Sequence, residues 1–207
     1  MSIVLALDLE MNQPSGKIIQ IRYVIADLSS LRVFEKKRLY VNPQEPLGII
    51  PEMNIPISQY TGITEDHIKQ HGMTLQEAYQ IMCSDVLKYN PTRTVVQWGG
   101  GSVEDGIGST GDADYLRQQL GLKWTDYIFR QGAWDVKNQY QIYQAFNRKK
   151  VVAGVEKALK TMDLEFEGRP HDALDDAWNT FRIFTYLGNK MVQLNRIEQI
   201  IKKPFSS

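Results

Sequence analysis

The sequence predicts an α/β fold, in which a mixed sheet is flanked by helices in a single domain over residues 1–207. Three observations lead to this class. The chain has 207 residues, of which 43% are hydrophobic and 23% charged, and this suits one domain with a sizeable core. Its first part contains β-rich runs. Its later part alternates helical patterns with a short apolar run, as α/β folds do.

The first three predicted strands follow one another directly. Residues 3–11 form an apolar run of strand length, and residues 18–28 and 31–42 are rich in β-forming side chains. Only Ser29 and Ser30 separate the second run from the third, and so short a connection joins antiparallel strands. We therefore predict an antiparallel meander in which only the first strand is apolar on both faces.

Helices and one further strand follow. Apolar residues recur at helical spacing from Leu75 to Tyr89, Pro91 closes that segment, and residues 94–98 form a short buried strand. Further helices are predicted at 112–120, 152–162 and 172–187, with a C-terminal helix over about 189–203. Three strands followed by a helix and a strand is the element order of a ribonuclease H-like sheet.

Residues 99–111 are rich in glycine. Six glycines in this segment predict a mobile insertion. A phosphate-binding loop is the alternative, but no Gly-Lys-Ser/Thr follows, and the next helix opens with Asp112, which would repel a phosphate. We therefore favour a flexible insertion beside the functional site.

Composition limits the classes of function. The formal net charge is +0 at pH 7, so affinity for nucleic acid must come from local groups or a bound metal. The only cysteine, Cys83, excludes an intramolecular disulfide and suits a reducing compartment. The first apolar run contains Asp8 and Glu10 and has no basic leader, so it is neither a signal peptide nor a membrane span. We expect a cytoplasmic protein without a membrane partner.

The first strand carries two carboxylates that indicate a metal. Residues at i and i+2 of a strand point to the same side, so Asp8 and Glu10 are neighbours. Two like charges this close are costly to bury unless a cation lies between them, and hard divalent cations prefer oxygen ligands. The strand therefore predicts a metal site.

Residues 171–177, His-Asp-Ala-Leu-Asp-Asp-Ala, supply a third acid. If Asp172 caps the following helix, Asp176 points inward, where an unpaired carboxylate is costly, and Asp175 points toward Asn179 and Arg182. Asp176 is therefore the candidate metal ligand.

One of the three histidines is a candidate base. His171 directly precedes the helix, where an imidazole with an unperturbed pKa of about 6.5 can take a proton from an attacking water. His67 and His71 lie in a segment that helix-start chemistry explains without catalysis.

Together these motifs resemble the DEDDh branch of the DnaQ-like 3'-5' exonucleases. Asp8-x-Glu10 and His171-x-x-x-x-Asp176 are similar to its two acids on the first strand and its terminal His-x4-Asp. Residues 61–64, Thr-Gly-Ile-Thr, resemble a further family element, and 167–177 are similar to the KapD and enhanced-RNAi exoribonuclease group. Asp8-Leu9-Glu10-Met11 also looks like oligoribonuclease. The resemblance covers nearly the whole chain.

The resemblance implies a mechanism and a substrate. Two Mg²⁺ or Mn²⁺ ions would be bridged by Asp8, with Glu10 and Asp176 completing one site and Asp112 supporting the other. Such a pair clamps the attacking and leaving oxygens of an in-line displacement. His171 would be the general base, and single-stranded RNA, ahead of DNA, would be shortened from its 3' end to nucleoside 5'-monophosphates.

The middle acid departs from the family pattern. The family's Trp-Gly-x-x-Asp becomes Trp98-Gly99, then the glycine-rich insertion, then Asp112. In a helix that begins here, Asp112 shares the inward face with Tyr115, Leu116 and Leu120, whereas Asp114 aligns with Arg117 and Gln118. This pattern favours Asp112 as the site residue.

Several residues keep two interpretations. Met11 and Asn12 either contact the terminal nucleotide or serve as strand-end packing and a turn residue. Residues 148–150, Arg-Lys-Lys, either hold substrate phosphates or form a solvated turn. The aromatic residues Tyr140, Tyr143 and Phe146 recur at helical spacing, which favours a packing stripe over a base-stacking platform.

Two other functions compete with the exonuclease. One is a nucleic-acid-binding or adaptor module of the same fold that has lost hydrolysis, although the chain has all four acids and the histidine. The other is a phosphodiesterase acting on small nucleotides or oligonucleotides, which the oligoribonuclease-like Met11 keeps open.

Overall fold

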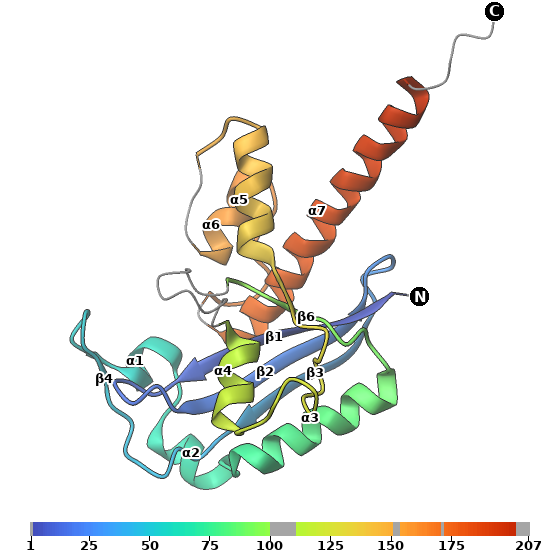
Figure 1. Cartoon of the computed structure of the whole chain (residues 1–207). Coiled ribbons are helices and arrows are strands. Elements are labelled where there is room, and N and C mark those ends of the chain that lie inside the picture. Colours follow the sequence, from blue (N-terminus) through green and yellow to red (C-terminus); the bar gives the residue numbers. More distant parts are fainter. Residues whose placement is uncertain (1, 100–110, 151–153, 171, 202–207) are drawn as a thin grey trace, which may run out of the picture.

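The computed structural model describes the chain except for residues 1, 100–110, 151–153, 171 and 202–207 (Figure 1). A five-stranded sheet has the order β3-β2-β1-β6-β7, with the first three strands antiparallel and the last two parallel to β1. The α/β class, the mixed sheet and the meander are thus confirmed. The strands of this sheet are β1 (Ile3–Met11), β2 (Ile18–Asp27), β3 (Val33–Tyr40), β6 (Val95–Gln97) and β7 (Ala133–Asp135).

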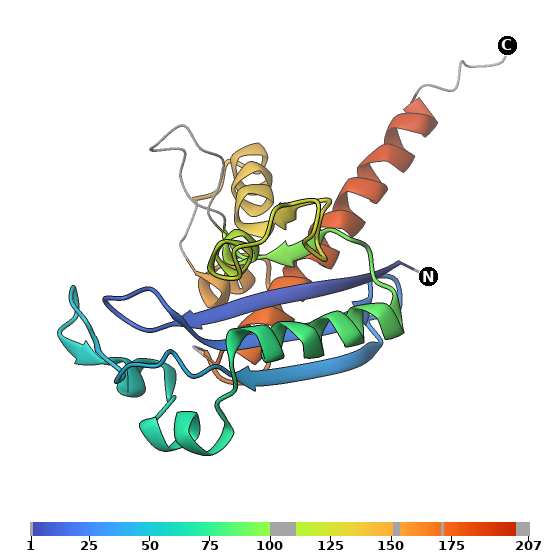
Figure 2. The ribbon, with the colours of Figure 1, turned by 60° about the horizontal axis from the view of Figure 1, so that its bottom comes forward.

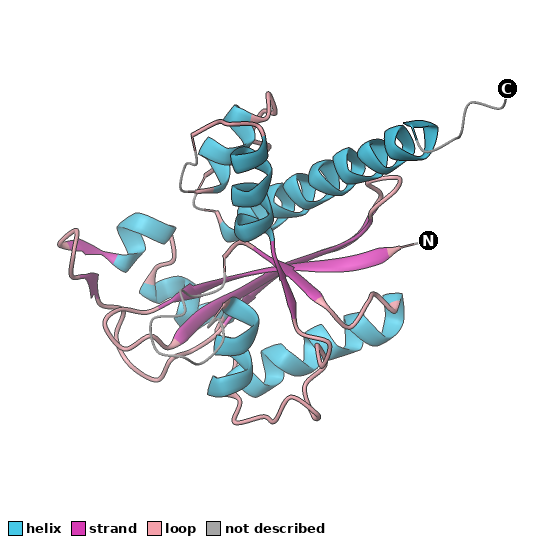
Figure 3. Ribbon diagram, turned by 45° about the horizontal axis from the view of Figure 1, so that its top comes forward, coloured by secondary structure: helices cyan, strands magenta, loops and turns pink. Residues whose placement is uncertain are grey.

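Helices cover both faces of the sheet (Figure 3). One face packs against α3 and α4, and the other packs against α5, α6 and α7. A short hairpin and two short helices lie near the carboxyl end of β1 (Figure 1). The remaining elements are β4 (Ile49–Ile50), β5 (Ile55–Pro56), α1 (Ile57–Thr61), α2 (Glu65–His71), α3 (Leu75–Tyr89), α4 (Asp112–Gln119), α5 (Val136–Phe146), α6 (Val155–Thr161) and α7 (Ala173–Ile201).

The alternation along β1 decides which face carries its acids. Leu5, Leu7 and Leu9 pack into the core beneath α3 and α4. Val4 and Ala6 pack into the other core, beneath α5, α6 and α7. Because side chains alternate along a strand, Asp8 and Glu10 continue the row on the α7 face. This face is therefore apolar at the start of β1 and acidic at its end.

The second strand is more buried than predicted. All ten residues of β2 are buried, so this strand is covered on both faces although the sequence predicted only the first strand to be apolar on both. The reason is the strand order, which places β2 between β1 and β3 with helices on both sides. Two polar side chains of β2, Gln20 and Arg22, are consequently buried on the α7 face.

The two helices predicted at 172–187 and about 189–203 are one helix, α7. Gly188 lies inside it, because a helical glycine costs only about 1 kcal/mol relative to alanine and the flanking residues continue the helix. The C-terminal part of α7 projects away from the sheet (Figures 1 and 2). Among the described residues, no helix has the length and apolarity needed to cross a membrane.

The aromatic stripe of α5 is only partly a packing stripe. Tyr140 is fully buried, whereas Phe146 is 84% exposed, so the predicted packing is wrong at this residue. Phe146 instead lines a groove of about 700 Å³ between α5 and α7, together with Ile142 and Met191.

Candidate functional site

The carboxyl end of β1 carries two neighbouring acids. Asp8 and Glu10 are partly buried and lie two residues apart on the α7 face. Burial raises the pKa of Asp8 well above its usual range. Three carboxylates raise it further, in decreasing order Asp112, Glu10 and Asp176. Burial also raises the pKa of Glu10 to about 7, although the positive charge of Arg22 opposes the shift.

Asp112 is held near these acids by the start of α4. The side chain of Gln97, the last residue of β6, accepts a hydrogen bond from the backbone N–H of Ala113 at 3.0 Å. The backbone N–H of Leu9 donates to the Asp112 carboxyl group, which lowers its pKa, but burial is the larger effect and raises that pKa to about 7. The first residue of α4 is therefore an electrostatic neighbour of β1.

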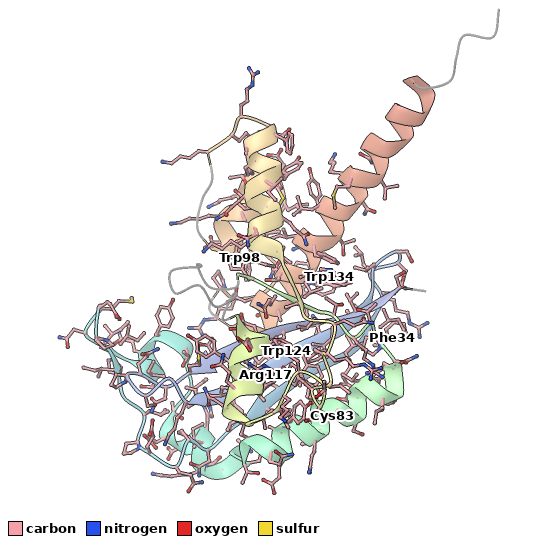
Figure 4. All side chains as sticks on the ribbon, viewed as in Figure 1. Phe34, Cys83, Trp98, Arg117, Trp124 and Trp134 are labelled. Atoms are coloured by element: carbon pink, nitrogen blue, oxygen red, sulfur yellow. The ribbon has the colours of Figure 1, made fainter. Side chains whose placement is uncertain are left out.

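Asp114 has a different environment. Its carboxylate accepts hydrogen bonds from Arg117 at 2.7 Å and Gln118 at 2.9 Å. Arg117 also lies over the ring of Trp124, with its guanidinium carbon 4.8 Å from the ring centroid; both residues are labelled in Figure 4. The predicted faces of α4 are partly wrong, because Asp114 is 9% exposed and Tyr115 is 36% exposed. Asp114 is buried because Arg117 neutralises it.

The start of α7 contributes the fourth acid. The backbone N–H of Leu174 donates to Asp172 Oδ1 at 3.0 Å, so the predicted cap is confirmed. Asp176 lines a cavity of about 340 Å³ that Asp8 also lines. Trp98, labelled in Figure 4, lines the same cavity from the end of β6. The carboxylates therefore form one group, which we call the carboxylate site: Asp8, Glu10, Asp112 and Asp176.

Asp175 points away from this cavity and supports the preceding loop. Its carboxylate accepts a hydrogen bond from the backbone N–H of Arg169 at 2.9 Å. Gly168 has a φ of +93°, and a Cβ at this position would overlap the Asp175 carboxylate. The glycine thus allows the loop to approach α7 closely.

The histidines are only partly placed. His171 lies outside the described residues, but Pro170 beside it lines the cavity shared by Asp8 and Asp176. His67 forms a capping box with Thr64 at the start of α2, which confirms the helix-start interpretation. Its ring also stacks on Tyr40, with a centroid distance of 5.5 Å.

The two candidate substrate residues differ in availability. Met11 lines a cavity of about 300 Å³ together with Glu10 and Tyr60. Asn12 is 2% exposed, and its side-chain amide donates to Glu45 and accepts from the backbone of Gly48. A substrate contact through this amide would break those bonds, so we assign Asn12 to loop support.

The donor chemistry of the carboxylate site fits a hard divalent cation. Carboxylate oxygens are the ligands that Mg²⁺ and Mn²⁺ prefer, and a cation would relieve the repulsion that raises the pKa of Asp8. Within the described parts of the chain, no three acidic, histidine or cysteine side chains gather into a compact metal cluster. The acids are therefore close enough to affect one another electrostatically, but they do not form a compact set of ligands around one point.

The sequence interpretation missed two arginines that hold the start of α7. Arg22 of β2 donates to Asp172 at 2.5 Å, and Arg38 of β3 donates to the same carboxylate at 2.7 Å. The signal available was a lone charge inside the apolar run 18–26. A charge at such a position requires a buried partner.

Comparison with known proteins identifies the fold. No protein-family model matches the chain, and no curated protein is similar to it in sequence. In structure the chain is similar to the nuclease domain of 3'hExo, a DEDDh family member bound to rAMP, with 19% identity and a TM-score of 0.63 over 91% of this chain and 92% of that one. It is also similar to cell-death related nuclease 4 (CRN-4), with 18% identity and a TM-score of 0.69 over 92% of this chain and 64% of that one.

A third similar structure is that of E. coli Exonuclease I in complex with a dT13 oligonucleotide, with 15% identity and a TM-score of 0.65 over 95% of this chain and 43% of that one. The chain thus spans less than two thirds of the last two proteins. The similarity confirms the ribonuclease H-like fold that the order of strands and helices predicted.

Proposed function

We propose that this protein is a divalent-metal-dependent 3'-5' exonuclease that acts on single-stranded nucleic acid. The observation that carries the proposal is the carboxylate site, where three separate segments bring four acids to one end of the sheet. Burial without a matching positive charge raises the pKa of three of them, and perturbed acids of this kind are typical of functional sites. The fold, shared with three nucleases, supports the same conclusion.

The residues divide the work as follows. Asp8, Glu10 and Asp176 would hold one cation, and Asp8 would hold the other with support from Asp112. When bound, two Mg²⁺ or Mn²⁺ ions stabilise the charge on the attacking and leaving oxygens of an in-line displacement. His171 acts as the general base and takes the proton of the attacking water. The water oxygen bonds to the phosphorus of the last phosphodiester and the bond from that phosphorus to the 3'-oxygen breaks. The 3'-oxygen takes up a proton from solvent, which leaves a shortened 3'-hydroxyl end and releases a nucleoside 5'-monophosphate.

The substrate end is bound next to the acids. Met11 shares a cavity with Glu10, so its thioether can pack against the terminal base. We place RNA ahead of DNA as substrate because one similar nuclease domain is described with rAMP and a related exonuclease structure with a histone mRNA stem-loop. The dT13 complex of a third protein makes DNA the necessary comparison.

The test is digestion of 5'-labelled single-stranded RNA and DNA of the same sequence. We expect a ladder of products shortened from the 3' end in Mg²⁺ or Mn²⁺ and no cleavage in chelator. Ca²⁺ should permit binding with little turnover, because its longer and looser coordination misplaces the attacking water. Undiminished cleavage in chelator would overturn the proposal.

The same experiment separates the competing functions. Binding without cleavage in every metal would indicate an adaptor module. Cleavage of dinucleotides with little action on longer strands would indicate a small-nucleotide phosphodiesterase.

A further inference from the structure

The β2 strand places two buried polar side chains beside the acids of β1. In the antiparallel register Arg22 lies opposite Asp8, and Gln20 lies opposite Glu10. Residues directly opposite each other share a face, with Cβ atoms about 4.5–5.5 Å apart. Gln20 is 0% exposed and Arg22 is 3% exposed. Each β1 acid therefore has a buried hydrogen-bond donor as its cross-strand neighbour.

Several polar atoms of these two side chains have no hydrogen-bond partner. In the part of the chain that the structure describes, both amide atoms of Gln20 and the Nε of Arg22 lack a hydrogen-bond partner. Native proteins rarely bury such groups without a partner, so each one requires an explanation. A hydrophobic side chain would fit this buried strand equally well, and its absence indicates a use for the donors.

The other end of the Arg22 guanidinium is occupied. Its Nη1 donates to Asp172, which caps α7, and the backbone carbonyl of Asp172 accepts the N–H of Asp176 at 2.8 Å. One buried side chain thus joins β2 to the helix turn that carries an acid of the site. Arg38 contacts the same carboxylate from a more exposed position, with 39% of its side chain accessible.

We propose that Arg22 and Gln20 are positioning residues for the carboxylate site, with Gln20 orienting Glu10 and Arg22 linking Asp8 to the start of α7. This inference rests on the proposed metal-dependent function. A carboxylate that turns one oxygen toward a cation leaves the other oxygen to accept a hydrogen bond, and such outer partners fix the ligand.

Gln20 gives the first test, by Mn²⁺ titration of the full chain and thermal unfolding. Gln20→Met keeps the size of the side chain but removes the unpartnered amide, so we expect unchanged or higher stability without metal and Mn²⁺ affinity lower by about 10- to 100-fold. A merely structural role of Gln20 predicts lower stability without metal and unchanged Mn²⁺ affinity. Gln20→Ala removes the same donor with a different packing change and should show the same loss of affinity.

The matched control is Gln144 of α5, another fully buried glutamine, whose amide nitrogen donates to Thr161 while its amide oxygen lacks a partner among the described residues. Gln144→Met should lower stability and leave Mn²⁺ affinity unchanged. Wild-type affinity in both Gln20 variants would overturn the role of Gln20.

Arg22 is tested with Arg22→Lys, which keeps the charge but cannot reach two partners with one planar group. We expect kcat to fall by about 10- to 100-fold with little change in KM. Arg38→Lys should lose less, because Arg38 lies on β3 opposite Arg22 and not opposite an acid of β1. Equal losses in the two variants would overturn the special role of Arg22. If the wild type cleaves no nucleic acid, the proposed function fails, but the Mn²⁺ titrations still decide whether these residues position the acids.

Discussion

The two faces of the sheet each bury acidic side chains, but in opposite ways. On the α3 face, Asp85 accepts a hydrogen bond from the Tyr23 hydroxyl at 2.6 Å and an ion pair from Lys37 at 3.1 Å. On the α7 face, Asp8 lies among three other carboxylates, and Arg22 is the cation that opposes their effect on its pKa. Asp85 therefore has a hydrogen-bond donor and a cation beside it, whereas the carboxylate site carries more negative than positive charge.

The difference separates stability from function. Buried polar groups normally have partners, so the Asp85 arrangement is what folding alone selects. The carboxylate site costs folding free energy in the absence of a cation, since like charges and burial both oppose ionisation. Such a cost is tolerated where a ligand restores the balance. Substitutions on the two faces should therefore have opposite consequences.

The largest expected effect comes from comparing Asp8→Asn with Asp85→Asn. Asp8→Asn should abolish cleavage nearly completely and raise the unfolding temperature of the metal-free protein at pH 7.5, because it removes repulsion. Asp85→Asn should retain activity but lower the free energy of unfolding by about 1–3 kcal/mol, as expected for hydrogen bonds to a charged group. The measurements are single-turnover cleavage and thermal unfolding. Loss of stability in Asp8→Asn would remove the contrast.

The same contrast exists within the first turn of α4. Asp112→Asn should abolish most of the activity at saturating Mg²⁺, whereas Asp114→Asn should cleave at a near-normal rate. Asp114 is paired with Arg117, so its replacement should lower stability instead. Cleavage rates and melting temperatures of both variants decide which aspartate belongs to the site. The reverse order of activities would assign that role to Asp114 instead of Asp112.

A smaller effect is expected for the general base. His171→Ala should lower turnover by about 10²- to 10⁴-fold with Mn²⁺ affinity largely retained, because it removes a proton acceptor and not a ligand. His67→Ala removes a cap at α2 and should reduce stability only. Equal losses of turnover in both variants would mean that the wrong histidine was chosen.

The smallest effect is a dependence of stability on pH. Burial raises the pKa of Glu10 and Asp112 to about 7, above the unfolded values of roughly 4. An acid whose folded pKa is raised contributes stability below its unfolded pKa, and that contribution is lost as pH rises through the folded pKa. The melting temperature without metal should therefore fall between about pH 4 and about pH 7 and change little above that, by about 2–4 °C for each kcal/mol lost.

Mn²⁺ should reverse this fall, and it should stabilise more at pH 7.5 than at pH 5.5 because the ligands must be ionised. Glu10→Gln should flatten the slope, since it removes one titrating group. A slope that is unchanged in this variant would assign the pH dependence to other residues.

Local pattern was sufficient to predict part of the site. The period of two along β1 placed Asp8 beside Glu10, and helix capping placed Asp172 at the start of α7. Both predictions depend only on neighbours in sequence. Asp112 lies beside the acids of β1, whereas Asp114 is paired with Arg117. The face argument used to choose between them was partly wrong, because an arginine allowed Asp114 to be buried.

Long-range pairing was not predictable in the same way. Nothing near Arg22 in the sequence identifies Asp172, 150 positions later, as its partner. The short β7 strand was also missed, because its pairing with β6 in the sheet fixes it. The sequence divided α7 into two helices on either side of Gly188, but a single glycine is too weak a signal to end a helix. The fold class followed from local patterns, and the support of the site required the three-dimensional arrangement.

Gly168 has a consequence for which amino acids each position can accept. Its left-handed backbone strains any other residue, and a Cβ there would displace the Asp175 carboxylate that holds the loop. Gly188, inside α7, has open space around it and lies in an ordinary helical backbone. In a saturation library, position 168 should retain glycine alone, whereas position 188 should tolerate alanine. Substitution of Gly168 would thus separate the loop beside the acids from α7, whereas substitution of Gly188 by alanine would have little effect.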